Sequence, residues 1–314
     1  METFLSCDWG TSAFRLRLVR GSDLRILAEI THTTGVADTY RRWTEAGCPP
    51  RQVFYASLLA KRITELARKS GDPLNGIPVV LSGMASSSIG MKELPYQKLP
   101  VHLDGSDLLV EHFDTEEAKN PLLVISGVQT DDDVMRGEET KIVGCLPMLK
   151  KQEAPELIIL PGTHSKHMVV QQHKAVAFKT YMTGEFFKLL SVDSVLSASI
   201  AADFVEEPAH RVWFRKGVRA AQESGLLHAA FLVRTNQLLK NTPKEANFHY
   251  LSGLLIGAEL TDIPRNMPVY LVAGSVHTPL YRAALEELDV KIHGGMDADE
   301  ALIAGQYMTL SRYY

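Results

Sequence analysis

The feature that most constrains this fold is a repeated pattern in which a polar turn joins two apolar strands. The first copy occupies residues 4–19, with its turn at Asp8–Ser12. The second occupies residues 157–178, with its turn at Pro161–Lys166. In the first copy, apolar and charged residues alternate as in a strand that buries one face. Two such units, far apart in one chain, predict two related lobes.

The rest of the chain alternates between short apolar runs and helical periodicity. Short apolar runs that end in small residues predict buried strands whose carboxyl ends face a site. They lie at 78–81, 122–125 and 269–273. Amphipathic spacing predicts helices at 53–69, 138–146, 186–190, 220–238, 250–260, 278–288 and 299–310. The pattern therefore indicates helices packed on sheets.

Size, charge and cysteine usage limit what the chain can be. Its 314 residues, 45% of them apolar, suffice for about two domains. Its 33 basic and 37 acidic residues are mixed along the chain, so neither nucleic acid nor a membrane is an expected partner. Cys7, Cys48 and Cys145 lie far apart without CxxC spacing, and the N-terminus lacks a secretion-signal pattern. A cytoplasmic protein is predicted.

The first turn has the residue types that bind a magnesium-phosphate group. Gly10 allows backbone N–H groups to approach phosphate oxygens, Thr11 and Ser12 add hydroxyl donors, and Asp8 can hold a metal ion. Asp and Gly also suit any tight turn, so this loop alone is weak evidence.

The second turn strengthens the argument because it repeats the same chemistry. Gly162, Thr163, His164 and Lys166 again offer backbone amides, a hydroxyl and cationic donors. Two such loops from two lobes predict a clamp for a polyphosphate, in which positioning and electrostatics supply most of the catalysis. Without the partner loop, simple solvation of a turn would be the better interpretation.

A third element is the apolar strand that ends at Gly274 and Ser275 before a predicted helix. Such a turn allows a flat adenine or a ribose to approach the backbone, although an ordinary strand-helix turn has the same pattern. The sequence has no GxGxxG fingerprint and no GxxxxGK followed by Ser or Thr, which disfavours Rossmann and P-loop folds.

An acidic segment with one arginine is the candidate substrate site. Arg136 can bind a carboxylate with two parallel hydrogen bonds, and Glu138 or Glu139 can accept the proton of an attacking hydroxyl. The alternative is that these residues have a structural role only, capping the start of a helix and forming an ion pair on the surface. Met84 and Ser86 follow a predicted strand end and are further candidates for substrate contact, although a serine run is more often a solvated loop.

Six blocks in this order resemble the 2-dehydro-3-deoxygalactonokinase family, within the actin, hexokinase and heat-shock chaperone ATPase superfamily. The likeness extends from residue 4 to about 305, and six ordered blocks are more specific than any single motif. The blocks are Asp8–Ser12, Val134–Thr140, Pro161–Lys166, Met182–Glu185, Ser252–Glu259 and Leu271–Gly274.

The resemblance implies an α/β, two-lobed actin-like (ribonuclease H-like) fold, each lobe a mixed sheet flanked by helices, with the nucleotide in a central cleft. The implied domains are 1–148, with the phosphate-1 loop and the sugar-acid site, and 149–297, with the phosphate-2 loop and the adenosine turn. The last helix, 298–314, packs back on the first domain. Gly144 and the small pair Ala304-Gly305 would lie where two connecting helices cross.

The same resemblance implies Mg²⁺-dependent transfer of the γ-phosphoryl group of ATP to the 6-hydroxyl of 2-dehydro-3-deoxy-D-galactonate. Asp8 would bind the metal, and Glu138 or Glu139 would be the base, where related sugar kinases generally carry aspartate. The implied nucleotide contacts are Gly10, Thr11, Ser12, Gly162, Thr163, His164, Lys166, Gly274 and Ser275. The implied sugar-acid contacts are Arg136, Met84, Ser86 and Arg15.

Three alternatives stay open on the sequence. One is a kinase for another sugar acid or an amino sugar. Another is an actin-like ATPase that transfers phosphate only to water, although a carboxylate-binding Arg136 has no role there. The third is a sugar-acid sensor without turnover. The sequence leaves the oligomeric state open, a homodimer included.

Overall fold

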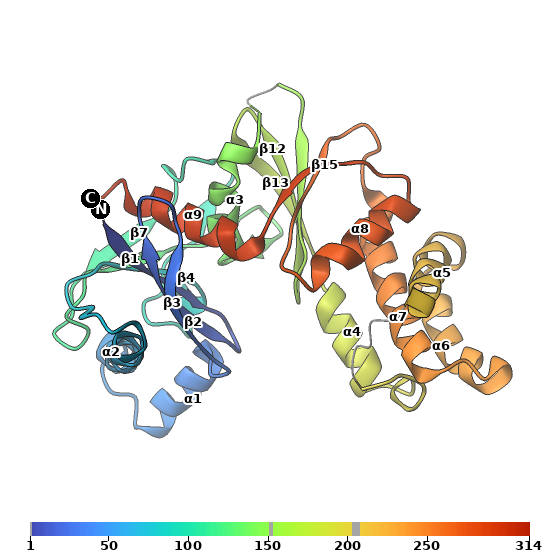
Figure 1. Cartoon of the computed structure of the whole chain (residues 1–314), viewed down its shortest axis with the longest axis horizontal. Helices are drawn as coiled ribbons and strands as arrows, with labels where there is room; N and C mark the ends of the chain where they lie inside the picture. Colours follow the sequence, from blue (N-terminus) through green and yellow to red (C-terminus); the bar gives the residue numbers. More distant parts are fainter. Residues whose placement is uncertain (1, 151–152, 203–207) are drawn as a thin grey trace. The chain divides into compact units, whose positions relative to one another are not determined.

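The computed structural model describes residues 2–150, 153–202 and 208–314, and the chain divides into two compact units. The first unit contains residues 1–153, 170–177 and 298–314; the second contains 154–169 and 178–297. Both chain ends therefore belong to the first unit (Figure 1). None of the helices in the described ranges is long and apolar enough to cross a bilayer.

The first unit is built on a six-stranded mixed sheet in the order β3-β2-β1-β4-β8-β7. Strands β1, β4 and β8 are parallel, whereas β2, β3 and β7 are antiparallel to their neighbours. The strands are β1 Thr3–Trp9, β2 Phe14–Arg20, β3 Ile26–His32, β4 Val79–Gly83, β7 Val110–Phe113 and β8 Leu122–Ile125. A small second sheet contains β5 Gln97–Lys98, β9 Val128–Gln129 and β10 Val134–Met135.

Helices cover both faces of this sheet because the strand side chains alternate. Leu5, Cys7 and Trp9 of β1 belong to one buried cluster with the apolar side of α2 (Arg51–Ser70). On the other face, the ring of Phe4 packs against Tyr307 of α9 (Ala298–Leu310). The remaining helices of this unit are α1 Val36–Glu45 and α3 Glu138–Gly144.

Two glycines allow α3 and α9 to cross at backbone contact. A Cβ atom on Gly144 would lie 1.8 Å from the carbonyl oxygen of Ala301, and one on Gly305 would lie 1.8 Å from that of Thr140. The crossing predicted at Gly144 and Gly305 is therefore confirmed. The amide nitrogen of Gln306, fully buried, lies 3.1 Å from the carbonyl oxygen of Cys7 and so joins α9 to β1.

The second sheet repeats the strand order of the first. Its order is β15-β14-β11-β12-β13-β6. Read in reverse from β13 to β15, this gives β13-β12-β11-β14-β15. In chain order these are the third, second, first, fourth and fifth strands of their unit, as are β3-β2-β1-β4-β8 in the first sheet. Strands β11, β14 and β15 are parallel. The strands are β11 Glu156–Leu160, β12 Ser165–Gln171, β13 Lys174–Tyr181, β14 Val269–Val272, β15 Ile292–Met296 and β6 Val101–His102.

The helices of the second unit are α4 Thr183–Val192, α5 Pro208–Ser224, α6 Leu226–Lys240, α7 Lys244–Glu259 and α8 His277–Glu287. Helices α5 and α7 also cross closely, because a Cβ on Gly253 would lie 2.0 Å from the carbonyl oxygen of Phe214. Two mixed sheets with helices packed on them confirm the predicted α/β class.

Several predicted boundaries were wrong for identifiable reasons. The helix predicted at 220–238 is two helices, because Gly225 adopts a φ of 70° between α5 and α6. The strand predicted across 168–178 turns back at Gln172 and His173, both with positive φ, and becomes β12 and β13. The polar turn predicted to end at Lys166 ends earlier, because Ser165 already begins β12.

The elements that the sequence patterns missed include β3, α1 and β15, as well as β7 and the two-residue strands β5, β6, β9 and β10. The strand β15 has the sequence Ile-His-Gly-Gly-Met, which lacks the apolar run of a buried strand. The strand β3 is partly exposed and contains charged and polar residues, and α1 buries only Val36 and Thr39. Tertiary pairing, rather than local pattern, stabilises these elements.

The glycine crossing in the first unit generates a stability prediction. Gly305→Ala places a methyl group on the backbone of α3, so we expect the free energy of unfolding to fall by about 3 kcal/mol. Urea unfolding measures this change. The matched control is Ala304→Ser on the half-buried neighbouring position, which we expect to leave stability within about 0.5 kcal/mol. Equal losses in both variants would contradict the crossing as the cause.

Candidate active site

The loop Asp8–Ser12 is the tip of the β1–β2 hairpin, and the start of α1 holds it in place. The N–H of Gly10 donates to the carbonyl of Ala13 at 2.9 Å, and the N–H of Ala37 donates to the carbonyl of Thr11 at 3.0 Å. The side chains of Thr11 and Ser12 are exposed. The loop therefore has a fixed backbone and presents two hydroxyl-bearing side chains to solvent.

Three segments of the first unit meet beside Asp8. Asp8 lies opposite Ser82 in the parallel pair β1–β4, and a Cβ on Gly83 would lie 3.6 Å from Asp8 Oδ1. A Cβ on Gly137, just before α3, would lie 3.0 Å from the Cα of Gly83. Gly83 and Gly137 both have positive φ, which favours glycine. The acidic start of α3 therefore lies close to the Asp8 carboxylate.

Glu139, in the first turn of α3, is a buried carboxyl group. It is 3% exposed, and its Oε2 accepts the N–H of Gly137 at 2.6 Å while its Oε1 accepts the hydroxyl of Thr140 at 3.1 Å. Burial, and next the charge of Glu138, raise the pKa of Glu139 to about 7. Glu138 itself is half-buried.

Arg136 is fixed in place by three contacts. Its Nη1 donates to Ser86 Oγ at 2.6 Å, its Nη2 donates to the carbonyl of Leu94 at 3.2 Å, and its guanidinium carbon lies 4.1 Å from the centre of the Tyr96 ring. Its Nε is buried and has no hydrogen-bond partner among the described residues. Met84 and Ser86 form the short 3₁₀ helix after β4. The structure therefore brings Arg136, Ser86 and Met84 together, as the sequence analysis supposed.

Tyr96 was missed because it follows Leu94 and Pro95 in a segment without regular periodicity, so nothing in the sequence singles it out. Arg15, predicted as a sugar-acid contact, is placed differently from the others. Its Nη1 pairs with Asp299 Oδ1 at 2.7 Å at the start of α9, and Asp299 also pairs with the buried Arg17. A role of Arg15 in substrate binding stays a prediction.

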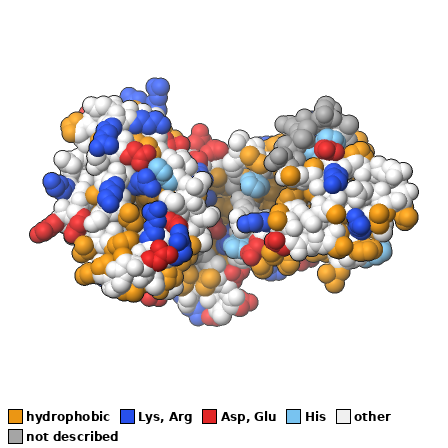
Figure 2. All heavy atoms as spheres, turned by 90° about the horizontal axis from the view of Figure 1, so that it is seen from below, with side chains coloured by type: hydrophobic (Ala, Val, Ile, Leu, Met, Phe, Trp, Pro, Cys, Tyr) orange, Lys and Arg blue, Asp and Glu red, His pale blue; other side chains and the backbone are white. Residues whose placement is uncertain are grey.

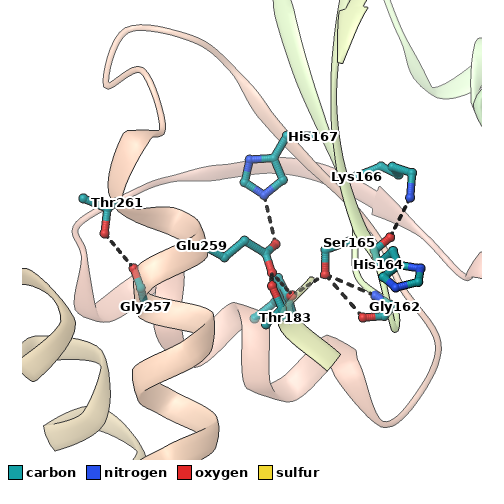
Figure 3. A network of polar contacts seen from close by, with 10 residues as sticks. Gly162, His164, Ser165, Lys166, His167, Thr183, Gly257, Glu259 and Thr261 are labelled. Atoms are coloured by element: carbon teal, nitrogen blue, oxygen red, sulfur yellow. Dashed lines mark hydrogen bonds and ion pairs between the residues drawn. The ribbon is translucent and has the colours of Figure 1, made fainter. Parts of the chain in front are cut away.

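In the second unit, hydrogen bonds among its own residues stabilise the loop after β11 (Figure 3). The N–H of Gly162 donates to Ser165 Oγ at 3.3 Å, and Lys166 Nζ donates to the carbonyl of His164 at 2.9 Å. Thr163 and His164 are exposed, whereas Lys166 is only 3% exposed. Contact of all three with phosphate stays a prediction.

The start of α4 packs against this loop from the other side. The N–H of Glu185 donates to the carbonyl of Thr163 at 3.1 Å, and its carboxylate binds His164 Nε2 at 2.5 Å. A Cβ on Gly184 would lie 2.8 Å from the carbonyl oxygen of Gly162. Glu185 lies in one of the blocks that resemble the family, but it was not predicted as a site residue because the sequence does not show its contact with the loop.

The turn at Gly274 and Ser275 lies at the mouth of a pocket. The pocket measures about 820 Å³ and is bounded by α8, α5 and the segment that leads into β15. Ser275 and Phe214 line it, as do Leu280 and Ile292, together with several arginines. A Cβ on Gly274 would meet no atom within 4 Å, so the backbone there is open to a ligand. A pocket of this size suits a drug-sized organic molecule.

Comparison with known proteins decides the family. The family model described as 2-keto-3-deoxy-galactonokinase matches residues 8–309. The chain belongs to this family. The family predicted from the sequence blocks is confirmed, and with it the prediction of an ATP-using kinase.

Individual relatives match over nearly the whole chain. A probable 2-dehydro-3-deoxygalactonokinase of Rhizobium meliloti is 30% identical, covering 96% of this chain and 94% of the relative. The 2-dehydro-3-deoxygalactonokinase of Escherichia coli is 29% identical, covering 95% of each. A crystal structure from Sinorhizobium meliloti, of a protein named as a candidate 2-dehydro-3-deoxygalactonokinase, superimposes with a TM-score of 0.83 at 28% identity, covering 99% of this chain and 97% of that one.

The buried carboxyl of Glu139 generates a pH prediction. Its pKa in the folded protein, about 7, lies above the ordinary value of 4.5, so between these values the folded protein holds a proton that the unfolded chain releases. The contribution of Glu139 to stability therefore falls as pH rises through this window, by about 3 kcal/mol in all.

Glu139→Gln cannot ionise and keeps a carbonyl acceptor for Gly137, so its stability relative to the wild type should rise across the same window. Urea unfolding at about pH 5 and about pH 8 measures the difference. The control is Glu116→Gln at an exposed position, whose difference from the wild type should stay constant. A constant difference for Glu139→Gln as well would exclude the raised pKa.

Proposed function

We propose that this kinase transfers the γ-phosphoryl group of ATP to the 6-hydroxyl of 2-dehydro-3-deoxy-D-galactonate. Family membership supports the reaction. The single observation in the structure that supports the proposal is the guanidinium of Arg136, held in place by protein contacts on the segment that leads directly into the acidic start of α3. An enzyme that only hydrolysed ATP would have no use for such a group.

The sugar-acid carboxylate would bind Arg136. A guanidinium presents parallel N–H donors that match a carboxylate, and the Tyr96 ring keeps the plane of the group fixed. The unpartnered Nε supplies a donor that no protein atom among the described residues uses. Ser86 and Met84, which follow β4, and Arg15 on β2 complete the proposed acceptor site.

Two criteria favour different residues as the base, and geometry takes precedence. The pKa of about 7 favours Glu139, but both of its oxygens already accept protein hydrogen bonds and its side chain is buried. A base must first come within hydrogen-bond reach of the hydroxyl. We assign the base to the half-buried Glu138, which takes the 6-hydroxyl proton as the oxygen bonds to the γ-phosphorus and the bond to ADP breaks. Glu139 fixes the start of α3.

The residues around Asp8 fit a magnesium ion. Mg²⁺ prefers oxygen ligands and is usually held by one or two carboxylates, water and substrate phosphates. Asp8 is half-buried at a strand end beside the hydroxyl loop, which fits that donor set. When bound, the ion would neutralise charge on the transferring phosphoryl group. Thr11 and Ser12 would donate to phosphate oxygens, and Gly10, whose own N–H is bonded to Ala13, would leave room for the phosphate to approach the backbone.

The nucleotide would use the second unit's loop and pocket. Gly162, Thr163, His164 and Lys166 supply the proposed phosphate contacts. The pocket of about 820 Å³, lined by Ser275, has apolar residues such as Phe214 and Leu280 among its lining, against which an adenine would pack. We place the phosphate-1 loop and the acceptor site in the domain 1–148, and the phosphate-2 loop and the adenosine turn in 149–297.

We also propose that the enzyme works in the cytoplasm on small molecules. Cys7, Cys48 and Cys145 are free thiols, which suits a reducing compartment. On the face shown in Figure 2, Lys and Arg side chains are interspersed with Asp and Glu, a surface that does not favour nucleic acid. A homodimer is a further proposal, which light scattering of the purified protein tests.

The first experiment is an ADP-release assay with Mg-ATP. We expect turnover with 2-dehydro-3-deoxygalactonate well above that with its gluconate epimer, with an amino sugar, or without an acceptor. Arg136→Met should raise the KM for the sugar acid about 10- to 100-fold, the range for losing a charge-assisted pair, and leave the KM for ATP unchanged. Equal ADP release under every condition would overturn the proposed function.

Arg51→Met is the matched control for this variant. Arg51 Nη1 donates to the carbonyl of Ser88 in the segment that carries Ser86, and its guanidinium lies 5.9 Å from the ring centre of Trp43. It therefore loses contacts of the same kinds, but no role in substrate binding is proposed for it. A similar rise of the sugar-acid KM in both variants would show that Arg136 acts through local structure instead.

The assignment of the base is tested separately. Glu138→Gln should lower kcat by about 10²- to 10⁴-fold, the usual contribution of a general base. Glu139→Gln, which keeps the contact with Gly137, should lower kcat less than about 10-fold. Steady-state kinetics with saturating sugar acid distinguishes the two. The reverse ranking would assign the proton transfer to Glu139.

A further inference from the structure

A buried carboxylate in the second unit has no part in the chemistry proposed above. Glu259 is the last residue of α7, and its side chain is 1% exposed. Three side chains donate hydrogen bonds to it: the hydroxyl of Tyr281 at 2.6 Å, His167 Nε2 at 2.9 Å and the hydroxyl of Thr183. Figure 3 shows His167 and Thr183 beside Glu259. These donors come from β12, α8 and α4, so one carboxylate joins four elements.

Burial of a carboxylate is costly, and an apolar side chain at the end of α7 would fill the same space without that cost. Three donors offset the cost, because hydrogen bonds to the charged form replace its water. These hydrogen bonds constrain the positions of the donors, because each donor must point at a carboxylate oxygen. Glu259 therefore fixes the positions of the elements that supply its donors.

One set of contacts leads from Glu259 to the loop after β11. The hydroxyl of Tyr281 donates to Glu259 and lies 3.0 Å from Ser165 Oγ, so the Ser165 hydroxyl donates to Tyr281. Ser165 Oγ in turn accepts the N–H of Gly162. The hydrogen bonds thus run in one direction, from Gly162 through Ser165 and Tyr281 to Glu259, and bonds aligned in this way strengthen one another.

A second set approaches the same loop from its other side. Thr183 begins α4, and two residues later Glu185 binds the Thr163 carbonyl through its N–H and His164 through its carboxylate. By holding Thr183, Glu259 also holds the start of α4 and the contacts made from it. The loop 162–164 is therefore held on both sides by groups that end at one carboxylate.

Tyr281 also belongs to the helix that follows the adenosine turn. Helix α8 begins at His277, two residues after Ser275, and Pro279 and Leu280 line the pocket of about 820 Å³. The loop at one end of the nucleotide and the pocket at its other end thus have a common attachment at Tyr281 and Glu259.

We propose that Glu259 is a positioning residue, which sets the loop 162–164 relative to α8 so that a nucleotide held in the pocket has its terminal phosphate aligned. The proposal rests on the assignment of the pocket and loop to ATP made above. Glu259 touches no substrate in this proposal; it acts through Tyr281, Ser165 and Thr183. Misplacement of a reacting group by about 1 Å can cost on the order of 100-fold in rate.

Tyr281→Phe tests the proposal with the smallest change. It removes the connection between Ser165 and Glu259 and keeps the ring, as well as the donors His167 and Thr183. We expect kcat to fall about 10-fold or more, with the affinity for ADP within about 2-fold of the wild type. The extra affinity of a non-hydrolysable ATP analogue over ADP, measured by calorimetry, should be lost.

Tyr250→Phe is the matched control. Tyr250 is a buried tyrosine of α7 in the same unit, and its hydroxyl donates to the carbonyl of Ala229 at 3.2 Å, away from the loop. It loses one buried hydrogen bond, as Tyr281→Phe does, so the thermal midpoints of the two variants should fall similarly. Its kcat and its preference for the ATP analogue should stay at the wild-type values.

Thr183 gives an independent rescue experiment. Thr183→Val removes the hydroxyl at constant shape and should lower kcat as Tyr281→Phe does, whereas Thr183→Ser keeps the donor and should retain wild-type kcat. Unchanged kcat in both Tyr281→Phe and Thr183→Val would overturn the proposal. So would an equal loss of kcat in Tyr250→Phe, because that pattern indicates general destabilisation.

The calorimetric readout separates this inference from the proposed function. If the wild type prefers the ATP analogue over ADP but phosphorylates no sugar acid, the proposed acceptor is wrong, and the loss of that preference in Tyr281→Phe still supports the positioning role. If the wild type shows turnover and Tyr281→Phe keeps both its kcat and its preference, the positioning role is wrong and the proposed function stands. A wild type that binds neither nucleotide overturns both.

Discussion

The arrangement of the first unit depends on one backbone contact, between Gly83 at the end of β4 and Gly137 before α3. A side chain on Gly137 would separate the two segments, because its Cβ would lie only 3.0 Å from the Gly83 Cα, and a Cβ on Gly83 would lie 3.0 Å from the carbonyl oxygen of Trp9. The contact brings the acidic first turn of α3 next to the strand end that carries Asp8. Arg136, one residue before the contact, is placed by the same approach. A proposed metal ligand, base and carboxylate-binding group are therefore neighbours because two positions lack side chains.

Much of this arrangement could be predicted from the sequence, and there is a physical reason why the rest could not. The two strand-turn-strand units, the buried parallel strands and the glycine crossing of α3 and α9 follow from local pattern and from the family resemblance. The partners of buried polar groups do not, because Glu259 and Tyr281 are separated by a strand and a turn, and no local periodicity relates them. Tyr96 and Glu185 were missed for the same reason. The choice between Glu138 and Glu139 also required burial, which two adjacent identical residues cannot reveal.

The two units position their site residues with different combinations of contacts. In the first, glycines bring backbones into contact, and side chains such as Arg136 are then positioned by short bonds to Ser86 and Leu94. In the second, a buried carboxylate gathers donors from separate elements, and these polar contacts add to the close backbone contact at Gly184. Backbone contact tolerates almost no substitution, whereas a polar network can lose one member and keep the others.

Membership of both chain ends in the first unit has a consequence for biosynthesis. Helix α9 supplies Gln306 to the carbonyls of Cys7 and Val80, and Asp299 to Arg17, so the sheet of the first unit lacks one of its covering layers until α9 has left the ribosome. The second unit, residues 154–169 and 178–297, precedes α9 in the chain and is synthesised before it. The nascent chain therefore carries an unfinished first unit while the second is synthesised, with one face of β1 accessible to chaperones until α9 emerges.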